Sequence, residues 1–151
     1  MQYFTMIYGI VETRNSRLLL TQAGHPSPIY QPKEAKAKPL GTGGFPVGLL
    51  PDVEYREEEV CLHPGDRLFF YSDGIPECTG KEGERFSVDR LIALVDEWRD
   101  RPLPDVMAGI KQAIERWRGS EQFEDDITLL ALEKEEQSRT QTSASGLLAV
   151  S

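Results

Sequence analysis

Short apolar runs separated by polar turns fill the first half of the chain. Residues 4–11, FTMIYGIV, are almost entirely apolar and predict a central strand, because a strand buried on both faces lacks a polar side. Residues 17–22 predict its hairpin partner, and residues 27–31 predict a short third strand. Residues 54–62 carry several acids, which favours an edge strand whose charges oppose pairing with another sheet.

Two amphipathic helices are predicted in the second half. Ser87 is the expected N-cap of the first helix, Asp105 or a neighbour opens the second, and Gly119 ends it. Their apolar positions recur with helical spacing and are Val88, Leu91, Ile92, Leu94, Val95 and Trp98, then Val106, Ile110, Ala113, Ile114 and Trp117. We expect both tryptophans to pack helix against sheet. The order of the predicted elements is several strands, two helices and a last strand at 127–132. This order predicts an α+β fold with a mainly antiparallel sheet and the helices on one face of it.

The remaining segments are polar. Residues 32–39, PKEAKAKP, predict a charged, exposed connector. Residues 1–133 predict a single domain, and residues 134–151 predict a flexible polar tail. The apolar end of that tail, 147–150, is available to pack on a neighbour.

Composition narrows the classes of function. The chain has 151 residues and a net charge of −8, which argues against nucleic acid or an anionic membrane surface as a partner. Its two cysteines, Cys61 and Cys78, are too few for a disulfide framework and predict reduced thiols. Because the sequence has neither a long apolar run nor a signal peptide, we expect a soluble cytoplasmic domain.

The most informative stretch is 68–77, LFFYSDGIPE. Its apolar residues predict a buried strand, Asp73 stands where the strand stops, and Gly74 permits a sharp turn. A carboxylate at the end of a buried strand is held rigidly and still reaches solvent, which suits a ligand of a hard cation such as Mg²⁺ or Mn²⁺. Asp-Gly is also a common hairpin turn, and that interpretation stays open.

A second acidic group, Asp125 and Asp126, precedes the apolar strand at 127–132. If this strand pairs antiparallel with 68–71, the end of one strand meets the start of the other, and the carboxylates converge with Asp73. Converging carboxylates repel one another unless a cation lies between them. The alternative is a solvated acidic loop before a strand.

Two further features are candidates for contact with a substrate. His25 lies between Gly24 and Pro26, where a histidine either takes part in acid–base chemistry or hydrogen-bonds to backbone in a turn. Residues 41–44, GTGG, form a glycine-rich loop of the kind that cradles phosphate through backbone N–H groups, although no P-loop Lys-Ser/Thr pair follows it. A flexible loop without function is the alternative.

Five segments, in order along the chain, resemble motifs of the metal-dependent protein phosphatases, the PPM family, in its bacterial SpoIIE/RsbU branch. YSDGIPE at 71–77 is similar to the YTDGV-(T/I)-E signature of that branch. The others are QAGHPSPI at 22–29, similar to NAGHPPP; GFPVGLL at 44–50, similar to G-x-P-L-G-L-L; LHPGDRL at 62–68, similar to L-x-P-G-D-x-L; and DDITL at 125–129, similar to DD-(I/M)-T. The resemblance covers about residues 3–133.

The resemblance implies a PPM-phosphatase-like α-β-β-α sandwich, of which this chain supplies part, and hydrolysis of phosphoserine or phosphothreonine with a pair of Mn²⁺ or Mg²⁺ ions. Asp73 and Asp125 would be metal ligands, and the Gly74 backbone would face the metals. Asp126 would be an alternative ligand or a supporting side chain. The family carries a flap near its active site in the region of Gly44, which implies substrate contact there. The implied partner is a phosphorylated anti-anti-sigma (STAS-like) protein, with sensor or receiver domains upstream.

The chain departs from the family because it lacks the G-D-x-x-D and D-x-S-G-H-G segments that carry further metal ligands. We therefore expect the C-terminal portion of a phosphatase domain, weakly active or inactive by itself. We expect it to associate with the missing portion, or with itself, to cover apolar surface on the inner faces of its sheets. A catalytically inactive phosphatase-like module that binds a regulatory partner is the alternative function.

Overall fold

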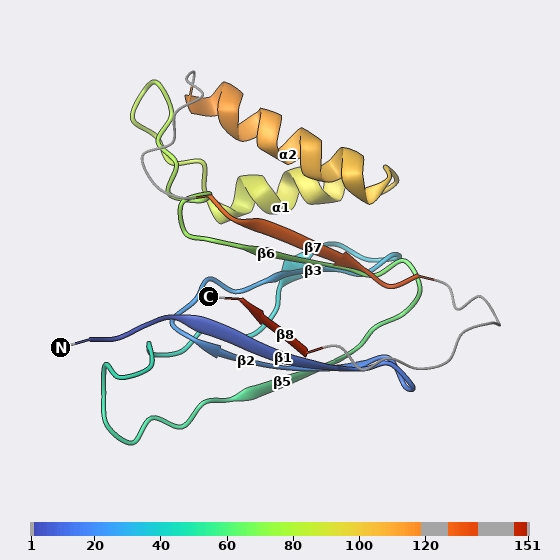
Figure 1. Cartoon of the computed structure of the whole chain (residues 1–151). Helices are drawn as coiled ribbons and strands as arrows, with labels where there is room; N and C mark the ends of the chain where they lie inside the picture. The colour runs from blue at the N-terminus through green and yellow to red at the C-terminus, as the bar shows by residue number, and fades with distance from the viewer. Residues whose placement is uncertain (1, 119–126, 136–146, 151) are drawn as a thin grey trace.

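The computed structural model describes residues 2–118, 127–135 and 147–150, the last of these as backbone only. Its elements form three layers, two sheets and a layer of helices that covers the outer side of one sheet (Figure 1). The strands are β1 (Met6–Glu12), β2 (Arg17–Ala23), β3 (Ile29–Gln31), β4 (Lys38–Pro39), β5 (Glu57–Cys61), β6 (Arg67–Tyr71), β7 (Leu129–Glu133) and β8 (Leu147–Val150). The helices are α1 (Val88–Glu97) and α2 (Leu103–Arg118).

Both sheets are antiparallel. The first has the order β5-β2-β1-β8 and the second the order β4-β3-β6-β7. β1 and β2 form the predicted hairpin, and β5 lies at a sheet edge, as its acidic residues predict. The pairing expected of the last strand is confirmed, because β7 runs antiparallel to β6 with Leu129 opposite Tyr71.

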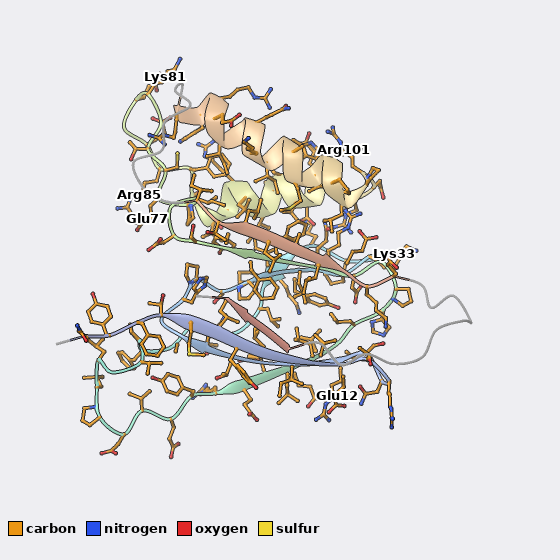
Figure 2. The ribbon with its side chains drawn as sticks, in the orientation of Figure 1. Glu12, Lys33, Glu77, Lys81, Arg85 and Arg101 are labelled. Carbon is orange, nitrogen blue, oxygen red and sulfur yellow. The ribbon has the colours of Figure 1, made fainter. Side chains whose placement is uncertain are left out.

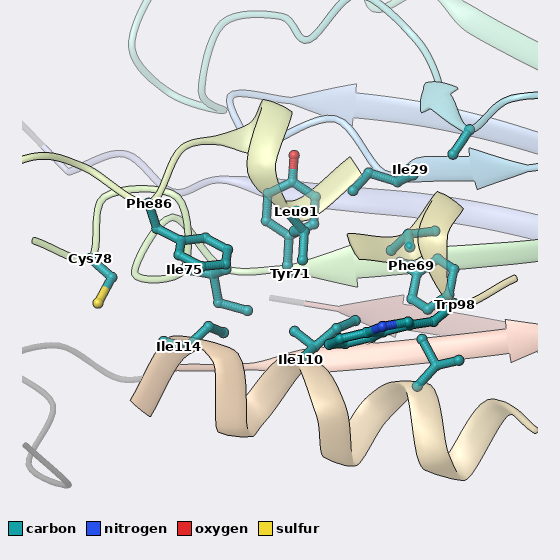
Figure 3. Close-up of a cluster of buried hydrophobic side chains, with 13 residues drawn as sticks. Ile29, Phe69, Tyr71, Ile75, Cys78, Phe86, Leu91, Trp98, Ile110 and Ile114 are labelled. Atoms are coloured by element: carbon teal, nitrogen blue, oxygen red, sulfur yellow. The ribbon is translucent and has the colours of Figure 1, made fainter. Parts of the chain in front are cut away.

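β6 is buried on both faces and separates two apolar cores. Leu68 and Phe70 face the first sheet, whereas Phe69 and Tyr71 face the helices (Figure 3). The core between the sheets also contains Ile7, Leu18, Leu20, Tyr30 and Leu40, and the core under the helices contains Ile29, Leu91, Val95, Trp98, Val106, Ile110 and Ile114. The uninterrupted apolar run of β6 therefore reflects its position between two layers.

Polar contacts tie the C-terminal end of α1 to the second sheet. The side-chain amide of Gln31, on β3, donates a hydrogen bond to the Val95 carbonyl at 2.7 Å. The Arg99 guanidinium donates to the carbonyls of Lys33 (3.1 Å) and Ala35 (2.9 Å) in the loop after β3. These bonds satisfy a carbonyl of the last helical turn and carbonyls of a loop, so they fix the helical layer on the sheet.

The structure refines three expectations. The connector at 32–39 is exposed over most of its length, but it contains β4 and buries Ala37. α2 begins at Leu103, just before Asp105, because a proline is tolerated in the first turn of a helix. The inner faces of the two sheets cover each other, and the first sheet instead leaves apolar side chains uncovered on the outer face of β1, with Ile10 45% exposed.

The end of the chain returns to the first sheet. β8 pairs with β1 of the same chain, with Val150 opposite Ile7. Residues 136–146 of the predicted flexible tail lie outside the described residues. Cys61 is exposed, Cys78 is buried, and neither forms a disulfide. Among the helices of the described residues, none has the length and apolar character to cross a membrane.

Candidate functional site

Asp73 lies where β6 leaves the second sheet. The chain turns at this point, with the Glu77 N–H donating to the Asp73 carbonyl at 3.0 Å and the Ile75 N–H donating to the Ser72 carbonyl at 3.2 Å. Ile75 is fully buried and anchors the turn, whereas the Asp73 side chain is exposed. The turn does not join two paired strands, since β6 pairs with β3 and β7. The alternative of a simple hairpin turn is therefore wrong.

A pocket of about 150 Å³ opens beside Asp73 and brings His25 to it. The turn after β2 supplies His25 and Pro26 to the lining, and Thr128, which directly precedes β7, also lines it. The His25 ring is 8% exposed, and its Nδ1 lies 3.2 Å from the Pro26 carbonyl oxygen. When Nδ1 carries the proton and donates to that oxygen, Nε2 remains as an acceptor. His25 is thus bonded to backbone in a turn and also lines a pocket with Asp73.

Ser72 and Thr128 lock the ends of β6 and β7 together. The Ser72 N–H donates to the Thr128 carbonyl at 3.0 Å, and the Thr128 N–H donates to the Ser72 hydroxyl oxygen at 3.0 Å. β7 therefore begins at the edge of the sheet where β6 ends. The predicted ligands Asp125 and Asp126 lie outside the described residues, and no group of three or more metal-ligating side chains occurs within residues 2–118 and 127–135.

Gly44 lies on a loop that is fastened to the end of β2, and it does not line the pocket of Asp73. The buried side chain of Gln22 accepts from the Gly43 N–H at 2.6 Å and donates to the Leu40 carbonyl at 3.0 Å. A Cβ on Gly44 would lie 2.8 Å from the Gln22 carbonyl oxygen, so the close approach requires glycine. Gln22 was not among the predicted site residues, although a polar residue at an inward-facing position of β2 is a signal for such a role.

Gly24→Ala is expected to lower the free energy of unfolding by about 2–4 kcal/mol, because an alanine there combines backbone strain with a clash. Gly24 has φ +70°, and a Cβ would lie 2.6 Å from Pro46 Cγ and 2.9 Å from Pro46 N. Gly83→Ala is the matched control, since Gly83 has φ +86° but nothing lies within 4 Å of its Cβ position. Strain alone predicts a cost of about 1–2 kcal/mol for the control. If urea unfolding gives the same loss of free energy for both variants, the clash with Pro46 adds nothing to the backbone strain.

Asp66, in the segment LHPGDRL, is a structural residue that sequence reasoning missed. Its side chain is 3% exposed and accepts hydrogen bonds from the Tyr30 hydroxyl (2.7 Å) and from the backbone N–H groups of Lys33 (2.9 Å) and His63 (2.9 Å). Burial acts to raise the pKa of this carboxyl, but the hydrogen bonds outweigh it and hold the pKa below its usual value. Burial and the bond to Asp66 in turn raise the pKa of the Tyr30 hydroxyl.

Asp73 fits one requirement of a metal ligand. Among the described residues, none donates a hydrogen bond to its carboxylate or forms an ion pair with it, so both oxygens remain available. Glu77, in the same turn, instead pairs with Arg85 at 3.2 Å (Figure 2). Oxygen donors of this kind suit Mg²⁺ or Mn²⁺, but a single carboxylate supplies only part of a two-metal site.

Comparison with known families identifies the family to which this fold belongs. The family model for stage II sporulation protein E (SpoIIE) matches residues 1–135. The chain belongs to the SpoIIE family. The motif around Asp73 and the pocket beside it therefore lie in a phosphatase domain of the PP2C type, the PPM phosphatases of the SpoIIE/RsbU branch.

Named relatives of the SpoIIE family match most of this chain. The chain is 28% identical to protein IcfG of Synechocystis over 86% of its length, and 26% identical to the phosphoserine phosphatase RsbU of Bacillus subtilis over 87% of its length. It spans only 20% of IcfG and 39% of RsbU.

A solved structure shows the same fold. The crystal structure of the RsbU and RsbW domains of Rv1364c from Mycobacterium tuberculosis superposes with a TM-score of 0.72 at 27% identity, covering 87% of this chain and 36% of that one. The predicted α+β sandwich of antiparallel sheets with two C-terminal helices is confirmed by this likeness and by the described layers.

Proposed function

We propose that this chain is the C-terminal part of a metal-dependent protein serine/threonine phosphatase domain. The observation that carries the proposal is the Asp73 carboxylate, which stands without a protein partner among the described residues at the end of a doubly buried strand. The antiparallel β7 begins at the same sheet edge, directly after the segment that contains Asp125 and Asp126. Asp73 and Asp125 are the proposed metal ligands, with Asp126 as an alternative ligand and the Gly74 backbone beside them.

The phosphatases of this family depend on Mn²⁺ or Mg²⁺. A bound pair of these ions would supply a water of lowered pKa and would neutralise charge on the phosphoryl oxygens. The task of Asp73 is to hold a rigid oxygen donor at the pocket. The task of His25, whose ring lines the pocket, is to bind a phosphoryl oxygen of the substrate or its leaving group. Gly44 lies on a loop that Gln22 holds next to the end of β2. We propose that its backbone contacts the phosphoprotein.

The remaining ligands are proposed to come from a segment N-terminal to this one, because the sequence has no G-D-x-x-D or D-x-S-G-H-G string. The uncovered outer face of the first sheet supports this proposal. Tyr8 and Ile10 expose apolar surface there, and a second layer of helices would bury it. The proposed substrate is a phosphorylated anti-sigma factor antagonist, since phosphatases named RsbU and RsbP are among the relatives.

The proposal is tested by Mn²⁺ titration in a calorimeter, with hydrolysis of p-nitrophenyl phosphate followed in parallel. In a chain completed by the N-terminal segment that the proposal requires, Asp73→Asn is expected to weaken Mn²⁺ binding by about 100-fold and to abolish turnover, because a neutral amide is a poor ligand for a hard cation. This 151-residue chain by itself is expected to bind Mn²⁺ weakly and to turn over little.

Glu77→Gln is the matched control. It neutralises a second exposed carboxylate in the same turn, and it is expected to leave both Mn²⁺ affinity and turnover within about twofold, because Glu77 already pairs with Arg85. Unchanged Mn²⁺ binding in Asp73→Asn would refute the assignment of Asp73. A natural protein that never turns over substrate but still binds a phosphorylated partner would favour the alternative, a catalytically inactive regulatory module.

A further inference from the structure

A groove of about 450 Å³ is lined by residues of α1 and α2. These two helices form the outer layer of the molecule (Figure 1). The floor of the groove is apolar and includes Leu94 of α1 and Ala113 of α2. Phe86 and Trp117 form one end of the groove, with their rings edge to face at 5.7 Å. A groove of this volume with an apolar floor has the dimensions of a ligand or peptide site.

Two arginines, Arg90 and Arg116, also line this groove. The Arg90 guanidinium carbon lies 4.2 Å from the centre of the Trp117 ring, a cation–π contact that holds the charge at the groove. Within the described residues neither arginine pairs with a carboxylate, in contrast to the arginines with acidic partners, which are Arg17, Arg67, Arg85 and Arg99. The groove therefore presents two positive charges that the described structure does not neutralise.

The position of Arg90 is unfavourable for the dipole of α1. It lies in the first turn of the helix, where the backbone dipole is positive and disfavours a cation. The cation–π contact with Trp117 offsets that cost, and among the described residues no carboxylate pairs with the guanidinium, so its charge is available to an anion that enters the groove. Since the chain as a whole carries −8, an acidic ligand would be repelled by most of the surface and attracted here.

We propose that the groove between α1 and α2 binds an acidic amphipathic helix of a partner protein. Apolar side chains spaced at i, i+3 and i+4 of that helix lie on the floor formed by Leu94 and Ala113, and its carboxylates pair with Arg90 and Arg116. The groove shares no lining residue with the pocket of Asp73. It is therefore a docking surface separate from the phosphatase site, and the proposal does not depend on catalysis.

The probe is a capped helical peptide built of Leu, Ala and Glu, with a counterpart in which every Glu is Lys. The readout is NMR of the indole N–H groups, because the chain has two tryptophans and only Trp117 lines the groove. Trp98 is buried against α2 at Gly109 and serves as the internal reference. Trp117→Phe assigns the signals. The acidic peptide is expected to shift the Trp117 signal and leave that of Trp98 in place.

Arg90→Glu/Arg116→Gln is expected to weaken binding of the acidic peptide at least about 10-fold. The substitution at Arg90 places an acid at a helix N-terminus, which favours α1, but it also removes the cation–π contact with Trp117. Urea unfolding of the double variant therefore checks that loss of binding does not reflect unfolding. The exposed pair Lys36→Glu/Lys81→Gln changes the net charge equally and is expected to alter affinity less than about twofold. Equal weakening in both double variants, equal binding of the Lys peptide, or no Trp117 shift at about 1 mM peptide would overturn the proposal.

Discussion

Arg67→Ala is expected to lower the free energy of unfolding by about 3–5 kcal/mol, because it removes three hydrogen bonds that a buried guanidinium donates. The Arg67 side chain is 8% exposed, and its Nε donates to Glu133 on β7 at 2.7 Å. Its two terminal nitrogens donate to the carbonyls of Arg99 (3.0 Å) and Arg101 (2.8 Å), in the loop between α1 and α2. Alanine would leave a carboxylate and two carbonyls without these partners at the seam between sheet and helices.

Arg17→Ala is the matched control for this loss. Arg17 also bonds to two acidic side chains, Glu12 and Glu59, but its own side chain is 41% exposed. The control is therefore expected to cost no more than about 1 kcal/mol, since water replaces exposed ion pairs at little cost. Denaturant unfolding of both variants compares them directly. If both substitutions lower the free energy of unfolding by the same amount, the burial of Arg67 does not contribute to stability.

Arg67 also shows where sequence reasoning stops. The run of β6 and the acids that follow it predict a doubly buried strand and a site at its end, because burial pattern and turn chemistry are local properties of the sequence. The pairing of β6 with β7 follows from a second apolar run that begins with acids. The partners of Arg67 are different, since Glu133 and the loop carbonyls are distant in the chain and nothing in the sequence indicates that they meet.

Two polar residues that hold loops around the site were not predicted, because their hydrogen-bond partners are also distant in the chain. Gln22 holds the loop of Gly44, and Asp66 holds the loop after β3. Asp66 resembles an ordinary turn residue in the sequence, and the inward-facing position of Gln22 on β2 indicates burial but not the loop to which it bonds. Two short strands were also beyond prediction, because β4 has two residues and β8 pairs with β1 only through tertiary structure. Local patterns thus predict which strand carries Asp73, whereas long-range polar contacts determine how firmly its surroundings are held.

Asp66→Asn is expected to lower the free energy of unfolding at pH 7 by about 3–5 kcal/mol. The carboxylate accepts three hydrogen bonds in a buried site, each worth about 1.5–3 kcal/mol when the acceptor is charged. An amide has the same shape but only one acceptor oxygen, so its NH₂ group would face the N–H or O–H donors of Tyr30, Lys33 or His63. Tyr30→Phe, which removes one of the three bonds, is the graded control and is expected to cost about 1–2 kcal/mol.

The pH dependence of the Asp66→Asn effect separates charge from shape. Because the folded-state pKa of Asp66 is lowered from the ordinary value of 3.8, its carboxylate stabilises the fold above about pH 4. That contribution is lost as the pH falls from 3.8 through the lower pKa of the folded state. The difference in unfolding free energy between the natural chain and Asp66→Asn should therefore narrow below pH 4, as measured by urea unfolding at each pH. A difference that stays constant from pH 7 down to about pH 3 would mean that the amide acts through poor packing, and that the charge of Asp66 does not stabilise the loop.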